Sequence, residues 1–303
     1  MSVNVAASLH GRLLNVAKRT GEEFERALVR YACERWLYRL GQSPHRDRFV
    51  LKGASLLSVW LPDPYRVTRD IDLMGFGRID TDLLRTSLSE IAEVACEEDG
   101  VLFDLSDLRI APIRAESENA GARALFLARL GKARIRMQLD IGFGDFVSSG
   151  PENVVLPLML PTLPSTSLLA YPREQTIAEK FEAMVQLGAR NGRMKDFHDV
   201  WALSGAFAFA RDRLRRAVSG CFERRGVPRM EQRPPVLTDA FYDVREMQQR
   251  WSGYRSAGGL LQPTPEHFDE IGERIIGFLL PLWEDVNGGS AQQRDWSPER
   301  GWQ

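Results

Sequence analysis

The segment RFVLKGASLLSVWLPDPYRVTRDIDLMG, residues 48–75, alternates short apolar runs with one tight turn and a pair of acids. Its first apolar run predicts a strand at 49–51, and later apolar positions have the spacing of a helix at 56–60. Between them, residues 52–55 (KGAS) form a turn that only small side chains fit. The segment therefore begins as strand, turn and helix.

Two aspartates lie in the second half of this segment. The run 68–74 (TRDIDLM) predicts another strand, in which Asp70 and Asp72 are two residues apart and project from one face. Neighbouring carboxylates repel each other unless a cation lies between them. Mg2+ prefers hard oxygen ligands and takes its remaining ligands from water and phosphates. The pair predicts a Mg2+ (or Mn2+) site, although an isolated D-x-D on a solvated strand is commonly incidental.

The turn before the helix at 56–60 predicts a phosphate site beside that metal. Backbone N–H groups around Gly53 and the hydroxyl of Ser55 stand where a helix opens, an arrangement that stabilises phosphate groups. Lys52 adds a positive charge next to them. Lys52, Gly53 and Ser55 are therefore candidate ligands of a nucleoside triphosphate.

A third carboxylate comes from a later predicted strand. In RIRMQLDI, residues 134–141, the alternation puts Arg134, Arg136, Gln138 and Asp140 on one face. A strand that ends in Asp beside a D-x-D strand is what a two-metal site for phosphoryl or nucleotidyl transfer needs. Asp140 is therefore a candidate third metal ligand.

The C-terminal half offers a cation and two further acids. Lys180 lies in a predicted helix, and as a single residue it fits an ordinary surface lysine. A cation that faces triphosphate oxygens would instead neutralise the charge that develops during transfer. Asp196 and Asp199 are three apart on a helix and share a face. In a purely structural alternative, Asp196 charges the first helical turn and Asp199 pairs with Arg193 or Lys195.

Basic residues cluster between positions 190 and 229, where ten Lys or Arg occur with four acids, while the whole chain has a net charge of -1. Such a cluster can bind an RNA backbone by releasing its counterions. A solvated helix face explains the same residues equally well. For a nucleotidyltransferase, a polyanionic acceptor with an accessible single-stranded end favours the RNA interpretation. The candidate RNA-binding residues are Arg190, Arg193, Lys195, Arg215 and Arg216.

Four blocks, LKGASLL, TRDIDLMG, QLDIGFGD and EKFEAMVQLGARNGRMKDFHDVW, occur in this order and resemble the AbiEii/AbiGii toxin family, which includes the MenT toxins. That family is part of the DNA polymerase beta-like nucleotidyltransferase superfamily, and the resemblance covers residues 45–205. Two features depart from it: Ala54 stands where the family often has a second Gly, and fourteen residues separate Ser55 from Asp70. Neither departure removes a side chain that the candidate site needs for its chemistry.

The resemblance implies a toxin of a toxin–antitoxin pair that transfers NMP from an NTP to the 3′ acceptor end of tRNA and so blocks translation. A cognate antitoxin protein would neutralise it. The resemblance also implies that Lys180, in the E-K-x-x-A block, and Asp196, in the K-D-x-x-D block, act in catalysis together with Asp70 and Asp72. Asp199 is a secondary candidate.

Two other functions fit the same sequence. The same site could transfer the γ-phosphate of an NTP to protein hydroxyls, including one near Thr68. Alternatively, the acids could be vestigial, which would leave a non-catalytic RNA- or partner-binding module. The identity of the transferred group separates the two enzymatic functions, and the effect of replacing Asp72 separates both from the third.

The expected fold class is α/β (α+β), because predicted strands and helices in the first half favour a nucleotidyltransferase-like mixed sheet of about five strands with flanking helices. A chain of 303 residues, 44% of them hydrophobic, is long enough for a second domain, which we expect to be helical. The expected parts are a nucleotidyltransferase-like domain with N-terminal helices at 1–150, a proline-rich crossing at 151–172, a helical domain at 173–288 and a flexible tail at 289–303.

Three widely spaced cysteines without a C-x-x-C pair indicate thiols in a reducing cytoplasm rather than disulfides or a zinc site. No apolar run is long enough to span a membrane, so no membrane partner is expected. Four arginines of the helix that follows Thr20 are expected on a solvated face with nearby glutamates as partners. They are Arg26, Arg30, Arg35 and Arg39.

Overall fold

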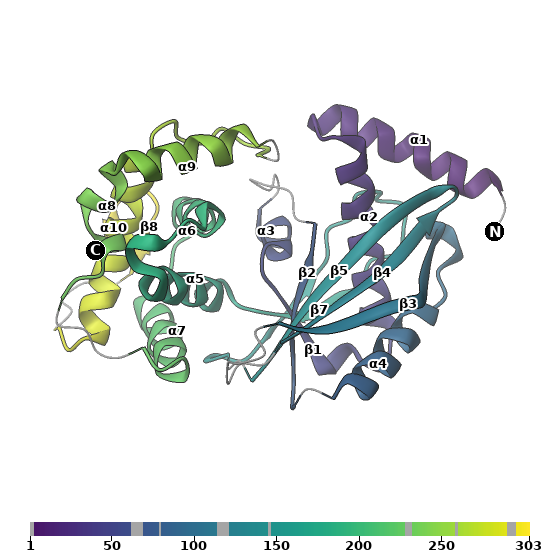
Figure 1. Ribbon diagram of the computed structural model, residues 1–303, viewed down its shortest axis with the longest axis horizontal. Coiled ribbons are helices and arrows are strands. Elements are labelled where there is room, and N and C mark those ends of the chain that lie inside the picture. The colour runs from purple at the N-terminus through teal and green to yellow at the C-terminus, as the bar shows by residue number, and fades with distance from the viewer. Residues whose placement is uncertain are drawn as a thin grey trace. The chain divides into compact units, whose positions relative to one another are not determined.

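The chain forms two compact units (Figure 1). The sheet unit consists of residues 1–145 and 151–171, and the helical unit of residues 146–150 and 172–303. The computed structural model describes residues 3–61, 69–78, 80–113, 121–144, 147–227, 232–257, 260–289 and 295–303.

A mixed seven-stranded sheet forms the centre of the sheet unit, in the order β3-β4-β5-β2-β1-β7-β6. The pairs β2/β5 and β1/β7 are parallel and the other neighbours are antiparallel. The predicted mixed sheet is confirmed, with two strands more than expected. The strands are β1 (Phe49–Lys52), β2 (Ile71–Gly75), β3 (Val101–Ile113), β4 (Gly121–Leu130), β5 (Ala133–Phe143), β6 (Glu152–Val155) and β7 (Ser167–Ala170).

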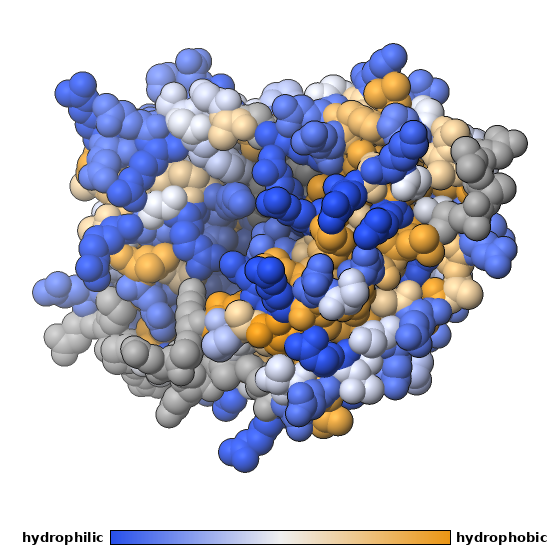
Figure 2. Space-filling model, turned by 45° about the vertical axis from the view of Figure 1, so that its right-hand side comes forward, coloured by the Kyte–Doolittle hydropathy of each residue, from blue (hydrophilic) through white to orange (hydrophobic). Residues whose placement is uncertain are grey.

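Helices cover one face of this sheet (Figure 1). Trp36 packs against Phe126 of β4, with ring centroids 4.7 Å apart, so the buried residues of β4 point toward these helices. Alternate β4 residues such as Arg123 and Leu125 are exposed on the opposite side, which we call the open face. Hydrophilic and hydrophobic side chains intermingle on the surface in Figure 2. The helices of the unit are α1 (Val3–Thr20), α2 (Phe24–Gln42), α3 (Ser55–Trp60) and α4 (Thr81–Glu93).

The proline-rich segment 151–172 is not the crossing between domains that the sequence predicts. It contributes β6 and β7 to the sheet, and β7 pairs in parallel with β1, where Leu51 lies opposite Ala170. Prolines exclude a helix, but they are compatible with strands near a sheet edge. The composition therefore identifies an extended segment correctly but assigns it to the wrong place in the fold.

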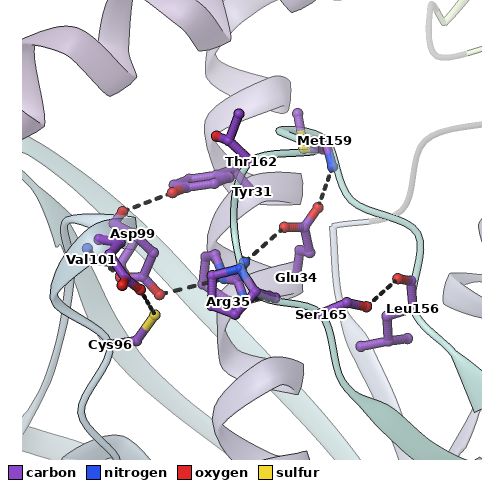
Figure 3. Close-up of polar contacts among 12 residues, drawn as sticks. Tyr31, Glu34, Arg35, Cys96, Asp99, Val101, Leu156, Met159, Thr162 and Ser165 are labelled. Carbon is purple, nitrogen blue, oxygen red and sulfur yellow. Dashed lines mark hydrogen bonds and ion pairs between the residues drawn. The ribbon is translucent and has the colours of Figure 1, made fainter.

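Two arginines of α2 are buried, which corrects the expectation of a solvated face. Arg39 donates to the two carboxylate oxygens of Asp99 at 2.6 and 3.1 Å. Arg35 is fully buried, with its Nε 3.4 Å from the same carboxylate, and the Tyr31 hydroxyl donates to the Asp99 carbonyl (Figure 3). Helical spacing cannot reveal a partner that lies 60 residues away. The other two arginines do pair locally, Arg26 with Glu23 and Arg30 with Glu22.

The helical unit is built around an aromatic core in which Phe197 contacts Phe241 and Phe268. Among the described residues, no helix combines the length and apolar character that crossing a membrane requires. The helices of this unit are α5 (Arg173–Leu187), α6 (Met194–Ala206), α7 (Arg211–Arg224), α8 (Asp239–Asp243), α9 (Arg245–Ser256) and α10 (Phe268–Val286).

Residues 295–303 belong to the predicted flexible tail but form a hairpin of β8 (Trp296–Ser297) and β9 (Gly301–Trp302). Trp296 is buried, and its indole N–H donates to the carbonyl of Ser204 at 2.8 Å. The Trp302 indole donates to the carbonyl of Phe278 at 3.0 Å. The polar composition of this segment predicts a mobile tail, but its two tryptophans pack against the helical unit and hold the hairpin in place.

Candidate active site

The turn after β1 brings a glycine against an acid of β2. Gly53 has φ +71°, a left-handed conformation that side-chain-bearing residues rarely adopt. A Cβ on Gly53 would collide with the Asp72 carboxylate and would lie 2.7 Å from its Cγ. Only glycine fits this close approach, so the turn that the sequence assigns to phosphate lies directly beside the acid assigned to metal.

A row of charges crosses four strands at this point. Lys52 of β1 lies opposite Asp72 of β2, Asp72 lies opposite Asp140 of β5, and Asp140 lies opposite Arg123 of β4. Residues directly opposite each other in a sheet project from the same face. The row therefore places two carboxylates side by side between two cations, as the predicted convergence of the two strands requires.

Arg123 is a member of this row that sequence reasoning does not identify. It binds Asp140 through two hydrogen bonds, Nε to Oδ1 at 2.8 Å and Nη2 to Oδ2 at 2.7 Å. The hydrogen bond to Asp140 raises the pKa of Arg123, and the charges of Asp140, Asp70 and Asp72 add to that increase. The two acids of the D-x-D pair thus act electrostatically on one guanidinium.

Asp70 lies at a bend just before β2, because the strand begins at Ile71 and not at residue 68 as predicted. Asp70 is half-buried, as is Asp72. Burial raises the pKa of the Cys33 thiol to about 12, and the charge of Asp70 contributes to this increase. Thr68, the predicted hydroxyl acceptor, lies outside the described residues.

The acids of the row fit a hard divalent cation, because carboxylates are the donors that Mg2+ and Mn2+ prefer, and the glycine turn brings backbone N–H groups close to the Asp72 carboxylate. Asp140 is already bound by Arg123, and the Gln138 amide also donates to it at 3.2 and 3.3 Å. Across the described ranges, no three His, Cys, Asp or Glu side chains are grouped as metal ligands. Asp140 could therefore bind a metal ion only if Arg123 released its carboxylate.

In the helical unit, one lysine holds two acids. Lys180 Nζ of α5 lies 2.9 Å from Asp196 Oδ1 and 2.7 Å from Asp199 Oδ2, both on α6. Arg193 Nε contacts the second oxygen of Asp196 at 2.8 Å. The side chain of Lys180 is only 12% exposed, so it is not an ordinary surface lysine. Asp199 pairs with this lysine, a partner that the structural alternative does not name.

His198 lies between these two acids in the sequence, but its side chain is buried in the core of the helical unit. It is fully buried, and its Nδ1 lies 2.9 Å from the Tyr254 hydroxyl. Its ring also stacks near Trp201, with centroids 5.8 Å apart. These contacts give the histidine a structural role in the helical unit.

Members of the predicted basic cluster differ in exposure and in their ion pairs, and Arg193 is both exposed and paired with Asp196. Arg225 pairs with Glu182 at 2.8 Å, and Arg213 lies 3.3 Å from Glu174. These pairs reduce the net positive charge that the cluster offers to a nucleic acid. The five candidate RNA-binding residues are all exposed: Arg190, Arg193, Lys195, Arg215 and Arg216.

The comparison with protein families now identifies the class. A family described as "Nucleotidyl transferase AbiEii toxin, Type IV TA system" matches residues 35–274. The chain is therefore a nucleotidyltransferase. It belongs to the AbiEii toxin family of type IV toxin–antitoxin systems, which confirms the resemblance of the four sequence blocks.

Two solved structures, both of Helicobacter pylori proteins, are similar along most of their length. JHP933 has 11% sequence identity, a TM-score of 0.46, and coverage of 95% of this chain and 93% of its own. The second, provisionally assigned as a nucleotidyltransferase, has 13% identity, a TM-score of 0.45, and coverage of 95% and 96%. No curated protein matches the chain.

Proposed function

We propose that this enzyme transfers an NMP group from an NTP to the 3′ acceptor end of tRNA, with Mg2+ or Mn2+ as cofactor, and thereby blocks translation. The observation that supports this proposal most is the contact of Asp72 with the bend at Gly53, within the row that also contains Asp140. Nucleotidyl transfer needs metal-binding carboxylates and a phosphate-binding turn next to each other, because one metal ion contacts both the protein and the phosphate.

The acids of β2 would hold the cation. Asp70 and Asp72 supply carboxylate oxygens, and Asp140 would join them if Arg123 released it. A bound divalent cation would neutralise phosphate charge and align the reacting oxygens. The turn supplies the other contacts, with the Gly53 backbone and the Ser55 hydroxyl as donors to the triphosphate and Lys52 as a nearby positive charge.

In the transfer step, the 3′ hydroxyl oxygen of the acceptor forms a bond to the α-phosphorus, and the bond to the β-phosphate oxygen breaks. Pyrophosphate leaves, and the hydroxyl proton passes to a carboxylate or to water. Lys180 would contribute positive charge toward phosphate, and Asp196 would take part with it in catalysis. Asp199 would assist by helping to hold that lysine.

The partners follow from the same proposal. A tRNA acceptor end is single-stranded and sterically accessible, and basic residues can bind its backbone. Within the helical unit, the exposed residues Arg190, Arg193, Lys195, Arg215 and Arg216 are the sequence-based candidates for that contact. A cognate antitoxin protein would neutralise the enzyme in the cytoplasm, where tRNA is available.

The test is to incubate the protein with total tRNA and each of the four NTPs, labelled in turn at the α- and the γ-phosphate, with Mg2+ or Mn2+. The proposal expects α-label to appear at tRNA 3′ ends, no γ-label in any product, and loss of the signal in Asp72→Asn. A folded protein that transfers no α-label from any NTP would contradict it.

Two alternative functions give different results in that experiment. A protein phosphotransferase would move γ-label onto protein, including the chain's own hydroxyls near Thr68. A non-catalytic RNA- or partner-binding module would transfer neither label, and its toxicity would survive the Asp72→Asn substitution. The close contact between Gly53 and Asp72 favours an enzymatic site over the non-catalytic module.

A further inference from the structure

The open face of the sheet carries five exposed arginines on three neighbouring strands. The buried residues of these strands are apolar and point toward the helices, whereas the arginines alternate with them. Apart from Arg123, none of the five has a place in the proposed chemistry. They are Arg109 of β3, Arg123 and Arg129 of β4, and Arg134 and Arg136 of β5.

The strand register brings like charges together on this face. Arg129 of β4 lies directly opposite Arg134 of β5. Like charges directly opposite each other destabilise a sheet. An acid relieves this repulsion on one side only, where Arg129 contacts Asp104 at 2.8 Å. The repulsion between Arg129 and Arg134 lowers the stability of the sheet, and an anion bound between them would offset this loss.

The remaining arginines are available to a ligand. Within the part of the chain that the structure describes, no acid forms an ion pair with Arg109, Arg134 or Arg136. Arg123 and Arg129 are paired, with Asp140 and Asp104 respectively. The open face of these three strands therefore keeps an excess of positive charge that the chain's overall charge of -1 conceals.

This basic surface is continuous with the candidate active site. Arg134, Arg136 and Asp140 project from the same side of β5, and Asp140 lies opposite Asp72. At about 3.3 Å per residue, the Cα atoms of Arg136 and Arg134 lie ~13 and ~20 Å from that of Asp140. A polyanion whose end lies at Asp72 could therefore follow β5 along one sheet face.

Apolar side chains lie among these arginines. Leu125 is 41% exposed and lies opposite Arg109, and Leu102 is 55% exposed and lies opposite Arg129. Unstacked bases offer apolar faces as well as hydrogen-bonding edges, whereas a duplex presents mainly phosphates. The mixture of guanidinium groups and exposed leucines fits a single strand better than a duplex.

We propose that the open face of β3, β4 and β5 binds the backbone of a single-stranded RNA segment that leads to the acceptor 3′ end. The proposal rests on the proposed function and adds the surface that holds the acceptor. Arginine suits this role because its planar guanidinium donates two parallel hydrogen bonds to a phosphate. Arg134 and Arg136 are the central residues, since they lie along the strand that leads to Asp140.

The test measures binding of a fluorescent single-stranded RNA oligonucleotide in EDTA without NTP, in an Asp72→Asn background, so that no chemistry contributes. Arg134→Ala/Arg136→Ala should raise the Kd at least tenfold at ~0.1 M salt. The association constant falls with salt, and each phosphate contact with a single strand adds ~0.7 to the magnitude of the slope of log K against log salt. Loss of two contacts should therefore reduce that magnitude by about 1.4. Arg109→Gln should have a smaller effect in the same direction.

Two double variants with the same change in charge serve as comparisons. Lys18→Ala/Arg19→Ala removes two exposed cations at the end of α1 and should leave the Kd and the slope unchanged. Arg215→Ala/Arg216→Ala removes two exposed arginines of α7 and should weaken binding less than the sheet-face variant does.

Unchanged binding in folded Arg134→Ala/Arg136→Ala protein would overturn the proposal. So would an equal loss in the Lys18→Ala/Arg19→Ala protein, because it would indicate a nonspecific effect of charge. If only the α7 variant loses binding, the RNA lies on the helical unit and the proposal fails. If the double sheet variant does not fold, Arg134→Gln and Arg136→Gln alone must each raise the Kd. Since binding is measured without NTP, failure of this proposal is distinguishable from failure of nucleotidyl transfer.

Discussion

The Asp72 carboxylate fills the space that a side chain on Gly53 would need. A turn with φ +71° and an acid from the neighbouring strand are thereby held in contact. The turn and the acid come from segments that the sequence separates by almost twenty positions, yet each restricts the other. This contact joins the proposed phosphate-binding and metal-binding parts of the site.

Replacing Gly53 by Ala should abolish that contact. The left-handed backbone alone costs an alanine about 1–2 kcal/mol of stability, and the new Cβ would also displace the Asp72 carboxylate. The rate of nucleotidyl transfer should fall at least tenfold. Gly77→Ala is the matched control, because Gly77 has φ +89° but no atom within 4 Å of where a Cβ would lie. Its unfolding free energy should fall while its transfer rate stays near wild type. Full activity in Gly53→Ala would contradict the proposed site.

Replacing Arg123 by Gln should strengthen metal binding. The guanidinium donates two hydrogen bonds to Asp140, and the charges of Asp70 and Asp72 also act on it. Its removal leaves these carboxylates with less positive charge, so the Kd for Mn2+ should fall severalfold. Arg136→Gln, with the same change in charge about 13 Å along β5 from Asp140, should have a smaller effect. Weaker Mn2+ binding in Arg123→Gln would mean that Arg123 positions a ligand and does not compete with the metal.

Replacing Lys180 by Met should destabilise the helical unit. The change leaves Asp196 and Asp199 without their shared lysine in a largely buried location, at a cost of roughly 3 kcal/mol. Neutralising both acids as well, in Lys180→Met/Asp196→Asn/Asp199→Asn, should restore most of the unfolding free energy measured in urea.

The same triple variant separates a structural role of Lys180 from a nucleotide-binding one. If Lys180 contacts the triphosphate, the restored protein should have a KM for NTP at least tenfold above that of Asp196→Asn/Asp199→Asn, which neutralises the same acids but keeps the lysine. An equal KM for NTP in the triple variant and in Asp196→Asn/Asp199→Asn would show that the lysine only holds the two acids in place.

The pH dependence of stability should report on Glu34. Burial raises its pKa from 4.5 to about 7, while the hydrogen bond from the Met159 N–H and the charge of Arg35 act in the opposite direction. The folded state therefore binds more protons than the unfolded state between about pH 4.5 and 7, so the stability from this group falls as the pH rises through that range. At about 1.36 kcal/mol per pKa unit, the full loss is on the order of 3 kcal/mol.

Urea unfolding at pH 5.5 and pH 8 measures this effect. Wild-type protein should lose stability at the higher pH, and Glu34→Gln should lose less, because glutamine can still accept the hydrogen bond from Met159 without titrating. An identical pH dependence in the two proteins would show that Glu34 does not titrate in this range.

Much of the arrangement of the candidate site can be predicted from the sequence, because the candidate residues are close together in the chain or follow simple alternation. The small-residue turn at Gly53, the pair Asp70 and Asp72, and the later acid Asp140 are all found in this way. Alternation also puts Arg134 and Arg136 on the face of Asp140, although it cannot show what the neighbouring strands add.

The parts that the sequence does not reveal depend on partners that are distant in the chain. Arg123 needs the β4/β5 register before it can be placed beside Asp140. Arg35 and Arg39 are expected in solvent because the partner of both, Asp99, lies far along the chain. Trp296 is assigned to a flexible tail because its contact with Ser204 spans 92 residues. In each case the outcome depends on a long-range contact that the local pattern does not contain.

The central claim is that the acids at the start of β2 hold a divalent cation for nucleotidyl transfer, and electron paramagnetic resonance of bound Mn2+ tests it most directly. Wild-type protein titrated with Mn2+ in the presence of an NTP should show saturable binding. Asp72→Asn protein with an unchanged melting temperature should bind Mn2+ at least tenfold more weakly. Equal Mn2+ affinity in the two folded proteins would contradict the account.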